Sequence, residues 1–107
     1  MKILNNGGLV GVNTMGSEVV NNFLLKQNYP NPFNPVTTIK YELKSSDFIQ
    51  IKVYDVLGSE VAQLVNEKQS SGAYEIKFDG SSLSSGVYFY KLTSNDFSEV
   101  RSMILLK

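Results

Sequence analysis

The chain has 107 residues, a length typical of a single domain, and 42% of them are hydrophobic, which is enough for an ordinary core. Ten basic and ten acidic residues give a net charge of zero, which disfavours nucleic acid as a partner. The absence of histidine and cysteine excludes disulfide bonds and thiol nucleophiles, and it removes the commonest metal ligands and the usual general base.

Residues 1–22 are rich in glycine and asparagine and show no sustained period, which predicts a linker or lead-in. They lack the unbroken apolar run of about 7–15 residues that a secretory signal needs, and no segment reaches the roughly 20 apolar residues of a membrane helix. We therefore expect either that the protein stays inside the cell or that an upstream cargo region precedes it in a longer chain.

From residue 23 the sequence predicts seven strands. Residues 37–43, 48–55 and 73–79 alternate apolar and polar side chains with the period of two that marks half-buried strands. Residues 60–65 are apolar but irregular, so a helical turn is an alternative there, although length and neighbours favour a strand. The seven segments are 23–27, 37–43, 48–55, 60–65, 73–79, 87–93 and 97–107.

Turn signals separate these segments at spacings of about 8–12 residues, and no convincing helix intervenes. This pattern predicts an all-β fold, an immunoglobulin-like antiparallel β-sandwich of about seven strands over residues 23–107. The chain has neither the disulfide nor the tryptophan of antibody-type domains. Tyr88, two residues after Gly86, is a candidate for a tyrosine corner, with an ordinary core aromatic as the alternative.

All three prolines lie in one segment, which we call the proline motif. Because proline lacks an N–H group and keeps the preceding residue extended, this segment is predicted to be stiff and unable to pair as an ordinary strand. We expect Tyr29 and Phe33 to insert into the sandwich as anchors. The motif could serve as a rigid connector, a preformed recognition surface, or both. It comprises Asn28, Tyr29, Pro30, Asn31, Pro32, Phe33, Asn34 and Pro35.

No group of residues predicts catalysis, so we expect no enzyme active site, no cofactor and no metal site. The segment 79–86, DGSSLSSG, resembles a calcium loop only superficially, because it lacks alternating carboxylates and a closing glutamate. Calcium held by backbone oxygens is the remaining alternative. The aromatic side chains of Tyr54, Tyr88, Phe89 and Tyr90 would suit carbohydrate binding, but core packing is their commoner role.

Four motifs occur in a distinctive order: LKQNYPNPFNPVTTIKYEL (25–43), IKVYDVLGSEVAQLV (51–65), SGAYEIKFDGSSLSSGVYFYKL (71–92) and RSMILLK (101–107). Together they resemble the type A C-terminal sorting domain of type IX (Por) secretion, found on many secreted proteins of the Bacteroidetes. The resemblance implies an immunoglobulin-like sandwich that folds in the periplasm and is bound by the outer-membrane translocon and its shuttle. It also implies removal by a sortase-type peptidase within about residues 13–24, after which the cargo is released to the medium or joined to surface lipopolysaccharide.

By motif position, the resemblance identifies two segments recognised by the secretion machinery. A terminal strand ending in MILLK offers apolar side chains and a free edge or carboxylate, suited to strand addition, end capture or an edge-strand dimer. An ordinary core strand with a solvated lysine is the alternative. Since successive side chains alternate, one apolar face of this strand exceeds what a small core needs. The recognition residues are Gly86, Val87, Tyr88, Met103, Ile104, Leu105, Leu106 and Lys107.

The alternative function is a structural or carbohydrate- or protein-binding accessory module, through a looser resemblance to the immunoglobulin-like domain of flagellar hook-capping proteins. A sorting signal predicts that residues added after Lys107 block export, whereas an accessory module predicts indifference to them. The sorting hypothesis also predicts that deleting residues 103–107 abolishes secretion of a fused reporter and leaves its periplasmic folding intact.

Overall fold

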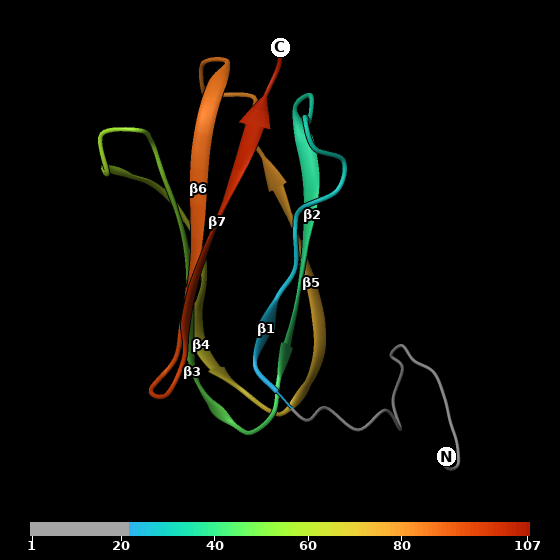
Figure 1. Ribbon diagram of the computed structural model, residues 1–107, viewed down its shortest axis with the longest axis vertical. Helices are drawn as coiled ribbons and strands as arrows, with labels where there is room; N and C mark the ends of the chain where they lie inside the picture. Colours follow the sequence, from blue (N-terminus) through green and yellow to red (C-terminus); the bar gives the residue numbers. More distant parts are fainter. Residues whose placement is uncertain (1–21) are drawn as a thin grey trace.

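Two antiparallel sheets packed face to face form the molecule in the computed structural model, which describes residues 22–107 (Figure 1). The sheets have the strand orders β1-β2-β5 and β4-β3-β6-β7, which confirms the immunoglobulin-like antiparallel sandwich. Residues 22–107 include no helix long and apolar enough to cross a membrane. The strands are β1 (Leu24–Leu25), β2 (Val36–Leu43), β3 (Asp47–Tyr54), β4 (Glu60–Gln69), β5 (Gly72–Asp79), β6 (Gly86–Thr93) and β7 (Ser98–Leu105).

All seven predicted strands are present, and their bounds differ most at the edges of the sheets. The segment starting at Glu60 is a strand, and it continues to Gln69 through a polar stretch that carries no apolar signal. The first strand has only two residues, and the last ends before Leu106. The predicted lead-in 1–22 lies outside the described residues except for Asn22, and the predicted cleavage region 13–24 lies outside them except for residues 22–24.

The core lies between the sheets and follows the predicted alternation. In β3, Ile49, Ile51 and Val53 are fully buried, and the residues between them are partly exposed on the outer face. Full burial of such a side chain stabilises the fold by about 1.5–3 kcal/mol, so the alternating pattern fixes which face of each strand points inward. The largest fully buried side chains are Tyr41, Tyr90, Phe33, Leu25, Ile39, Leu43, Ile49, Ile51, Leu92, Met103, Leu105 and Val53.

Two tyrosine corners close the turns that lead into β5 and β6. The Tyr88 hydroxyl donates a hydrogen bond of 2.7 Å to the Ser84 carbonyl, so the predicted tyrosine corner is confirmed. A second corner has the same form, with the Tyr74 hydroxyl 2.7 Å from the Ser70 carbonyl. Both belong to a repeated S-S-G-x-Y sequence. The glycines of the two repeats have φ values of 147° and 154°, which residues with a side chain rarely adopt.

Candidate functional site

The structure brings the predicted recognition residues and part of the proline motif together at one end of the sandwich, which we call the terminal pole. Phe33 forms a parallel bridge with Leu105, and Leu105 pairs with Gly86 at the start of β6. The chain ends at this pole, whereas β1 pairs with the far end of β2 (Figure 1). The first described residues and the C-terminus therefore lie at opposite ends of the molecule.

The proline motif and the preceding Gln27 cover the outer edge of the terminal half of β7. The Phe33 N–H donates to the Ile104 carbonyl (2.9 Å), and the Phe33 carbonyl accepts from the Leu106 N–H (3.0 Å). The Ile104 N–H donates to Asn31 Oδ1 (3.0 Å), and Gln27 Nε2 donates to the Ser102 carbonyl (2.7 Å). The prediction of a free terminal edge, open to strand addition or to an edge-strand dimer, is therefore wrong for residues 102–106, because these outer backbone groups already have partners.

The motif makes only isolated bridges to its neighbours, which confirms that it does not pair as an ordinary strand. All three of its X-Pro peptide bonds are cis. Of the two predicted anchors, Phe33 is buried, but Tyr29 is 81% exposed and that prediction is wrong. The side chain that points inward is that of the neighbouring Asn28. Successive side chains of an extended backbone point in opposite directions, so Tyr29 points outward.

Asn28 is a buried polar centre that holds the entry to the motif. Its Nδ2 donates to Thr37 Oγ1 (3.0 Å) and to the Pro30 carbonyl (3.1 Å), and its Oδ1 accepts from Gln27 Nε2 (2.7 Å). Its backbone N–H donates to the Tyr90 hydroxyl (2.7 Å). With these partners the burial of its amide is tolerated, because a buried polar group is costly only when unpaired.

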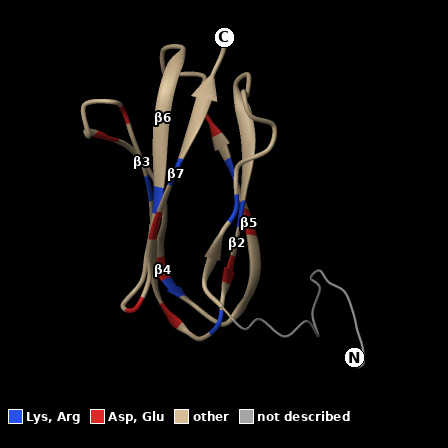
Figure 2. Ribbon diagram, viewed as in Figure 1, with Lys and Arg blue, Asp and Glu red and all other residues tan. Residues whose placement is uncertain are grey.

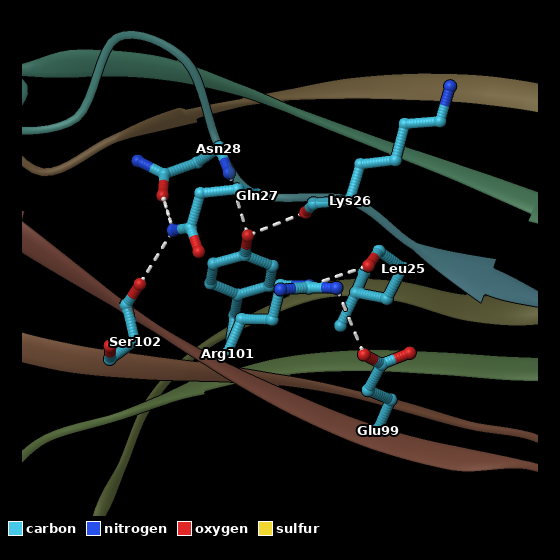
Figure 3. Close-up of polar contacts among 8 residues, drawn as sticks. Leu25, Lys26, Gln27, Asn28, Glu99, Arg101 and Ser102 are labelled. Atoms are coloured by element: carbon cyan, nitrogen blue, oxygen red, sulfur yellow. Dashed lines mark hydrogen bonds and ion pairs between the residues drawn. The ribbon is translucent and has the colours of Figure 1, made fainter.

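Hydrogen bonds of Tyr90 and Arg101 attach residues 25–28 to the four-stranded sheet. Figure 3 shows the contacts of Arg101 with Leu25 and Glu99. The Tyr90 hydroxyl also donates to the Lys26 carbonyl (2.7 Å), and burial raises the pKa of Tyr90 to about 12. Arg101 donates from Nε to the Leu25 carbonyl (2.6 Å) and forms an ion pair with Glu99 (3.2 Å). The bonds to Lys26 and Leu25 join β6 and β7 to the chain around β1, whereas the ion pair with Glu99 lies within β7.

The aromatic residues considered for carbohydrate binding divide between the two faces of the sheet. Tyr88 and Tyr90 are buried and contribute to the core, as the packing interpretation predicted. Tyr54 and Phe89 are half-buried on the outer face, where they pair across β3 and β6. The four rings therefore do not form one aromatic surface.

Gly80 gives Phe33 and Leu105 room to meet under the terminal pole. A Cβ atom at this glycine would lie 3.2 Å from Leu105 Cδ2 and 3.4 Å from Phe33 Cε2. The Phe33 ring also meets the Phe78 ring edge-on at a centroid distance of 6.0 Å. A glycine at this position, which has no Cβ atom, leaves the contact between Phe33 and Leu105 undisturbed. The sequence pattern did not predict this role of Gly80.

Lys107 is tied back to the loop between β5 and β6. Its Nζ donates to the carbonyls of Ser81 (2.7 Å) and Leu83 (2.9 Å), and its backbone N–H donates to Ser85 Oγ (2.9 Å). The backbone oxygens that we considered for calcium thus face an ammonium group of the chain itself. Within residues 22–107, no three His, Cys, Asp or Glu side chains gather in a way that could hold a metal ion.

The side chain of Asp79 completes the fixed geometry of this loop. Its Oδ1 accepts a hydrogen bond of 2.9 Å from the Ser81 N–H, and this bond lowers the pKa of the Asp79 carboxyl below its usual value. The Ser81 N–H therefore donates to Asp79, and the Ser81 carbonyl accepts from Lys107. The loop partners of the final lysine have no distinctive sequence pattern, and sequence reasoning missed them.

The predicted recognition residues separate into an inward and an outward set. Tyr88, Met103 and Leu105 are buried in the core. Val87, Ile104 and Leu106 are 41%, 39% and 54% exposed, and we call these three side chains the apolar face. Val87 and Ile104 lie directly opposite each other on β6 and β7. The sequence prediction that one face of the terminal strand exceeds the needs of the core is confirmed.

Charged residues are absent from the ends of β6 and β7 that carry the apolar face. On these two strands the charged residues are Lys91, Glu99 and Arg101, which lie toward the middle and the far end of the sheet (Figure 2). The apolar face therefore has no charged neighbour on the adjoining parts of β6 and β7. The next residue along the chain, Lys107, directs its charge to the carbonyls of Ser81 and Leu83. Such a surface can bury apolar area against a receptor without desolvating a charge.

Comparisons with known proteins agree with this architecture. The chain is similar in structure to PorZ, an essential bacterial surface component of the type-IX secretion system of Porphyromonas gingivalis, with a TM-score of 0.53 and 20% sequence identity. The match covers 79% of this chain and 11% of PorZ, so the chain spans about a tenth of that protein. At this identity the similarity supports the fold alone. No curated protein matches the sequence significantly.

The family comparison is more specific. Residues 27–106 match the family described as the secretion system C-terminal sorting domain. The matched region includes the proline motif and all of the terminal pole except Lys107, and it covers most of the chain. The chain therefore belongs to the family of secretion system C-terminal sorting domains, non-catalytic signal domains of type IX secretion.

Proposed function

We propose that this domain directs an upstream cargo polypeptide through the type IX outer-membrane translocon, with the shuttle and sortase components as partners. Family membership supports this proposal, and so does the position of the first described residues and the C-terminus at opposite ends of the sandwich. Cargo attached before Asn22 would not cover the terminal pole. In this proposal the domain passes through the periplasm, a sortase-type peptidase removes it, and the cargo is left at the cell surface or secreted.

The terminal pole is the proposed recognition site, and the apolar face is its contact surface. The observation that carries this proposal is the adjacency of two sequence-distant motifs: Val87 from the first meets Ile104 from the second. Burial of a half-exposed aliphatic side chain in a receptor contributes on the order of 1 kcal/mol. Three adjacent side chains on a fixed backbone would therefore give modest affinity together with a defined shape.

In this proposal the receptor reads side chains of the folded domain and does not add a strand to β7. The covered edge supports this mode, because strand addition would first have to displace Phe33 and Asn31 from Ile104. The fixed position of Lys107 supports it as well, since the last residues already have a defined conformation before any receptor binds.

A charge-insertion experiment tests the proposal without disturbing the core. Ile104→Lys places a charge in the apolar face, and Ser98→Lys places the same charge on the same face of β7, where the side chain is exposed, lies opposite the uncharged Thr93 and is far from the pole. In a host with type IX secretion, a reporter fused to the Ile104→Lys domain should accumulate in the periplasm, and the Ser98→Lys fusion should be exported.

Thermal unfolding of both purified variants is the control, and both should melt close to the parent domain. Export of the Ile104→Lys fusion at the parent level would contradict the proposed contact surface. Equal loss of export in both variants would mean that charge anywhere on this strand matters, which would also contradict it.

The deletion of residues 103–107 is a poorer test than we expected from sequence. Met103 and Leu105 are fully buried, and removing large aliphatic core side chains costs about 2–5 kcal/mol each. We therefore expect the deletion to unfold the sorting domain itself, even where the fused reporter folds, so loss of export would not separate recognition from folding of the domain.

A further inference from the structure

The four outer edges of the two sheets differ in how they are protected. The terminal half of the β7 edge is covered by the proline motif. The ladder between β4 and β3 is interrupted by two shifts of register, a common protection of edge strands, and β1 has only two residues. The edge of β5 has none of these features: it pairs with β2 in unbroken register over Gly72–Asp79, and no other strand within residues 22–107 pairs with it.

The backbone groups on the outer side of β5 can be assigned from the ladder. On β2, Thr38 and Lys40 direct their backbone bonds away from β5, to Tyr29 and Lys26. Hydrogen bonding alternates along an antiparallel strand, so residues such as Ile39 bond toward β5 through partners such as Ile76. The residues of β5 with outward N–H and C=O groups are then Ala73, Glu75, Lys77 and Asp79, whose side chains are all exposed.

The sequence of this strand is nearly symmetric about Ile76. In GAYEIKFDG, residues 72–80, three of the four pairs at equal distance from the centre are alike or complementary: glycine and glycine, tyrosine and phenylalanine, and glutamate and lysine. The fourth pair is alanine and aspartate. If two copies of β5 pair antiparallel about Ile76, each Glu75 lies opposite Lys77 of the other copy. This register also sets outward-bonding residues opposite each other, as an antiparallel ladder requires.

Neighbouring registers do not share this complementarity. Centring the pair on Glu75 or on Lys77 also matches outward residues, but it sets two carboxylates or two ammonium groups directly opposite each other. Like charges opposite one another destabilise a strand pair, and opposite charges stabilise it. The register about Phe78 also pairs unlike charges, Lys77 with Asp79, but it overlaps only residues 77–79 of the two strands. Charge and overlap together therefore favour the register about Ile76 for a second copy of the same chain.

We propose that β5 is a self-pairing edge that joins two copies of the domain in antiparallel register about Ile76. The three-stranded sheets of the two copies would then form one continuous six-stranded sheet. Because paired strands run in opposite directions, the two terminal poles face opposite ends of the dimer and stay uncovered. This inference is independent of the proposed export function.

A charge-swap series measured by sedimentation velocity tests the pairing. The parent domain should associate to a dimer as its concentration rises into the high micromolar range. Lys77→Glu should weaken association at least tenfold, because it sets two carboxylates opposite each other, and Glu75→Lys should do the same with two ammonium groups. The double variant E75K/K77E, which restores opposite charges, should dimerise like the parent.

Mixing the two single variants gives the sharpest readout, since their unlike edges are complementary and should form a heterodimer. This rescue separates pairing from folding, which is needed because Glu75 also lies opposite Lys40 within one copy. A parent domain that stays monomeric, single variants that dimerise like the parent, or a mixture without rescue would each overturn the proposal. Export of a Lys77→Glu reporter should persist, so this outcome is distinguishable from failure of the sorting function.

A cysteine pair tests the register directly, because the chain has no cysteine of its own. Two Ile76 residues would form a non-hydrogen-bonded pair with Cα atoms about 4.5 Å apart, which suits a disulfide. Ile76→Cys should give a covalent dimer under mild oxidation. Ala73→Cys on the same edge should not, because residue 73 would lie opposite residue 79. Equal crosslinking of both variants, or crosslinking of Ala73→Cys alone, would overturn the register.

Discussion

Individual polar atoms determine where the proline motif lies. The motif has no ladder of its own, and its entry is held by the Asn28 amide and by the Tyr90 hydroxyl, which bonds both Asn28 and Lys26. A hydrogen bond contributes about 0.5–1.5 kcal/mol, but leaving a buried partner unsatisfied costs about 1–3 kcal/mol. These side chains are thus more sensitive to substitution than their number of contacts suggests.

We predict that Tyr90→Phe lowers the free energy of unfolding by about 1–3 kcal/mol, because the Asn28 N–H and the Lys26 carbonyl both lose their partner. Urea unfolding followed by circular dichroism measures the change. Tyr29→Phe removes the hydroxyl of an 81% exposed side chain and serves as the control, with a change within about 0.5 kcal/mol. Equal effects of the two variants would contradict the role assigned to the Tyr90 hydroxyl.

The same burial predicts a pH dependence. Burial raises the pKa of both Tyr41 and Tyr90 to about 12, whereas tyrosine in an unfolded chain has a pKa of about 10. A group with a raised folded pKa contributes stability below pH 10, and this stability is lost as the pH rises toward 12. Absorbance at 295 nm should show a late ionisation step that disappears in the double variant Tyr41→Phe/Tyr90→Phe. Complete ionisation of all tyrosines by pH 11 in a folded domain would contradict it.

At the scale of secondary-structure elements, irregular segments cover the last strand of the four-stranded sheet and hold its end. β7 is the last strand of its sheet, and its terminal half is covered by a segment about 70 positions earlier in the chain, through backbone bonds to Phe33 and a side-chain bond to Asn31. The loop after β5 then holds Lys107 from the other side. A terminal strand that would otherwise fray is thus fixed on both sides.

We predict that Asn31→Ala speeds hydrogen exchange of the Ile104 amide by about fivefold, the equivalent of losing roughly 1 kcal/mol of protection, because Asn31 Oδ1 is its acceptor. Asn34→Ala, in the same motif and exposed, is the matched control. Exchange is measured residue by residue by NMR. If Ile104 exchanges equally in the two variants, Asn31 does not protect this edge.

In the whole molecule, the end where the described chain begins lies away from the end that carries the proposed recognition surface. The described chain enters at one end of the sandwich and finishes at the other, next to the apolar face (Figure 1). A single layered core connects the two ends, so the terminal pole keeps its shape whatever precedes the domain. This arrangement suits a signal that must function behind different cargo proteins.

We predict that a ten-residue polar extension after Lys107 blocks export of a fused reporter, because the added chain would begin beside Leu106 and crowd the apolar face. The same extension placed before residue 22, on the cargo side, should leave export unchanged. Cell fractionation with immunoblotting measures both fusions. Normal export of the C-terminally extended fusion would favour the accessory-module interpretation.

Local pattern was sufficient to predict the seven strands, the sandwich, the tyrosine corner and the outward apolar face of the terminal strand. These features depend on side-chain alternation and turn residues, which are visible within a few neighbouring positions. The tertiary structure alone decided that Asn28 and not Tyr29 points inward, that the edge of β7 is covered, and that Lys107 binds loop carbonyls. Those contacts join backbone groups and polar side chains from distant parts of the chain, and such contacts leave no periodic trace in the sequence.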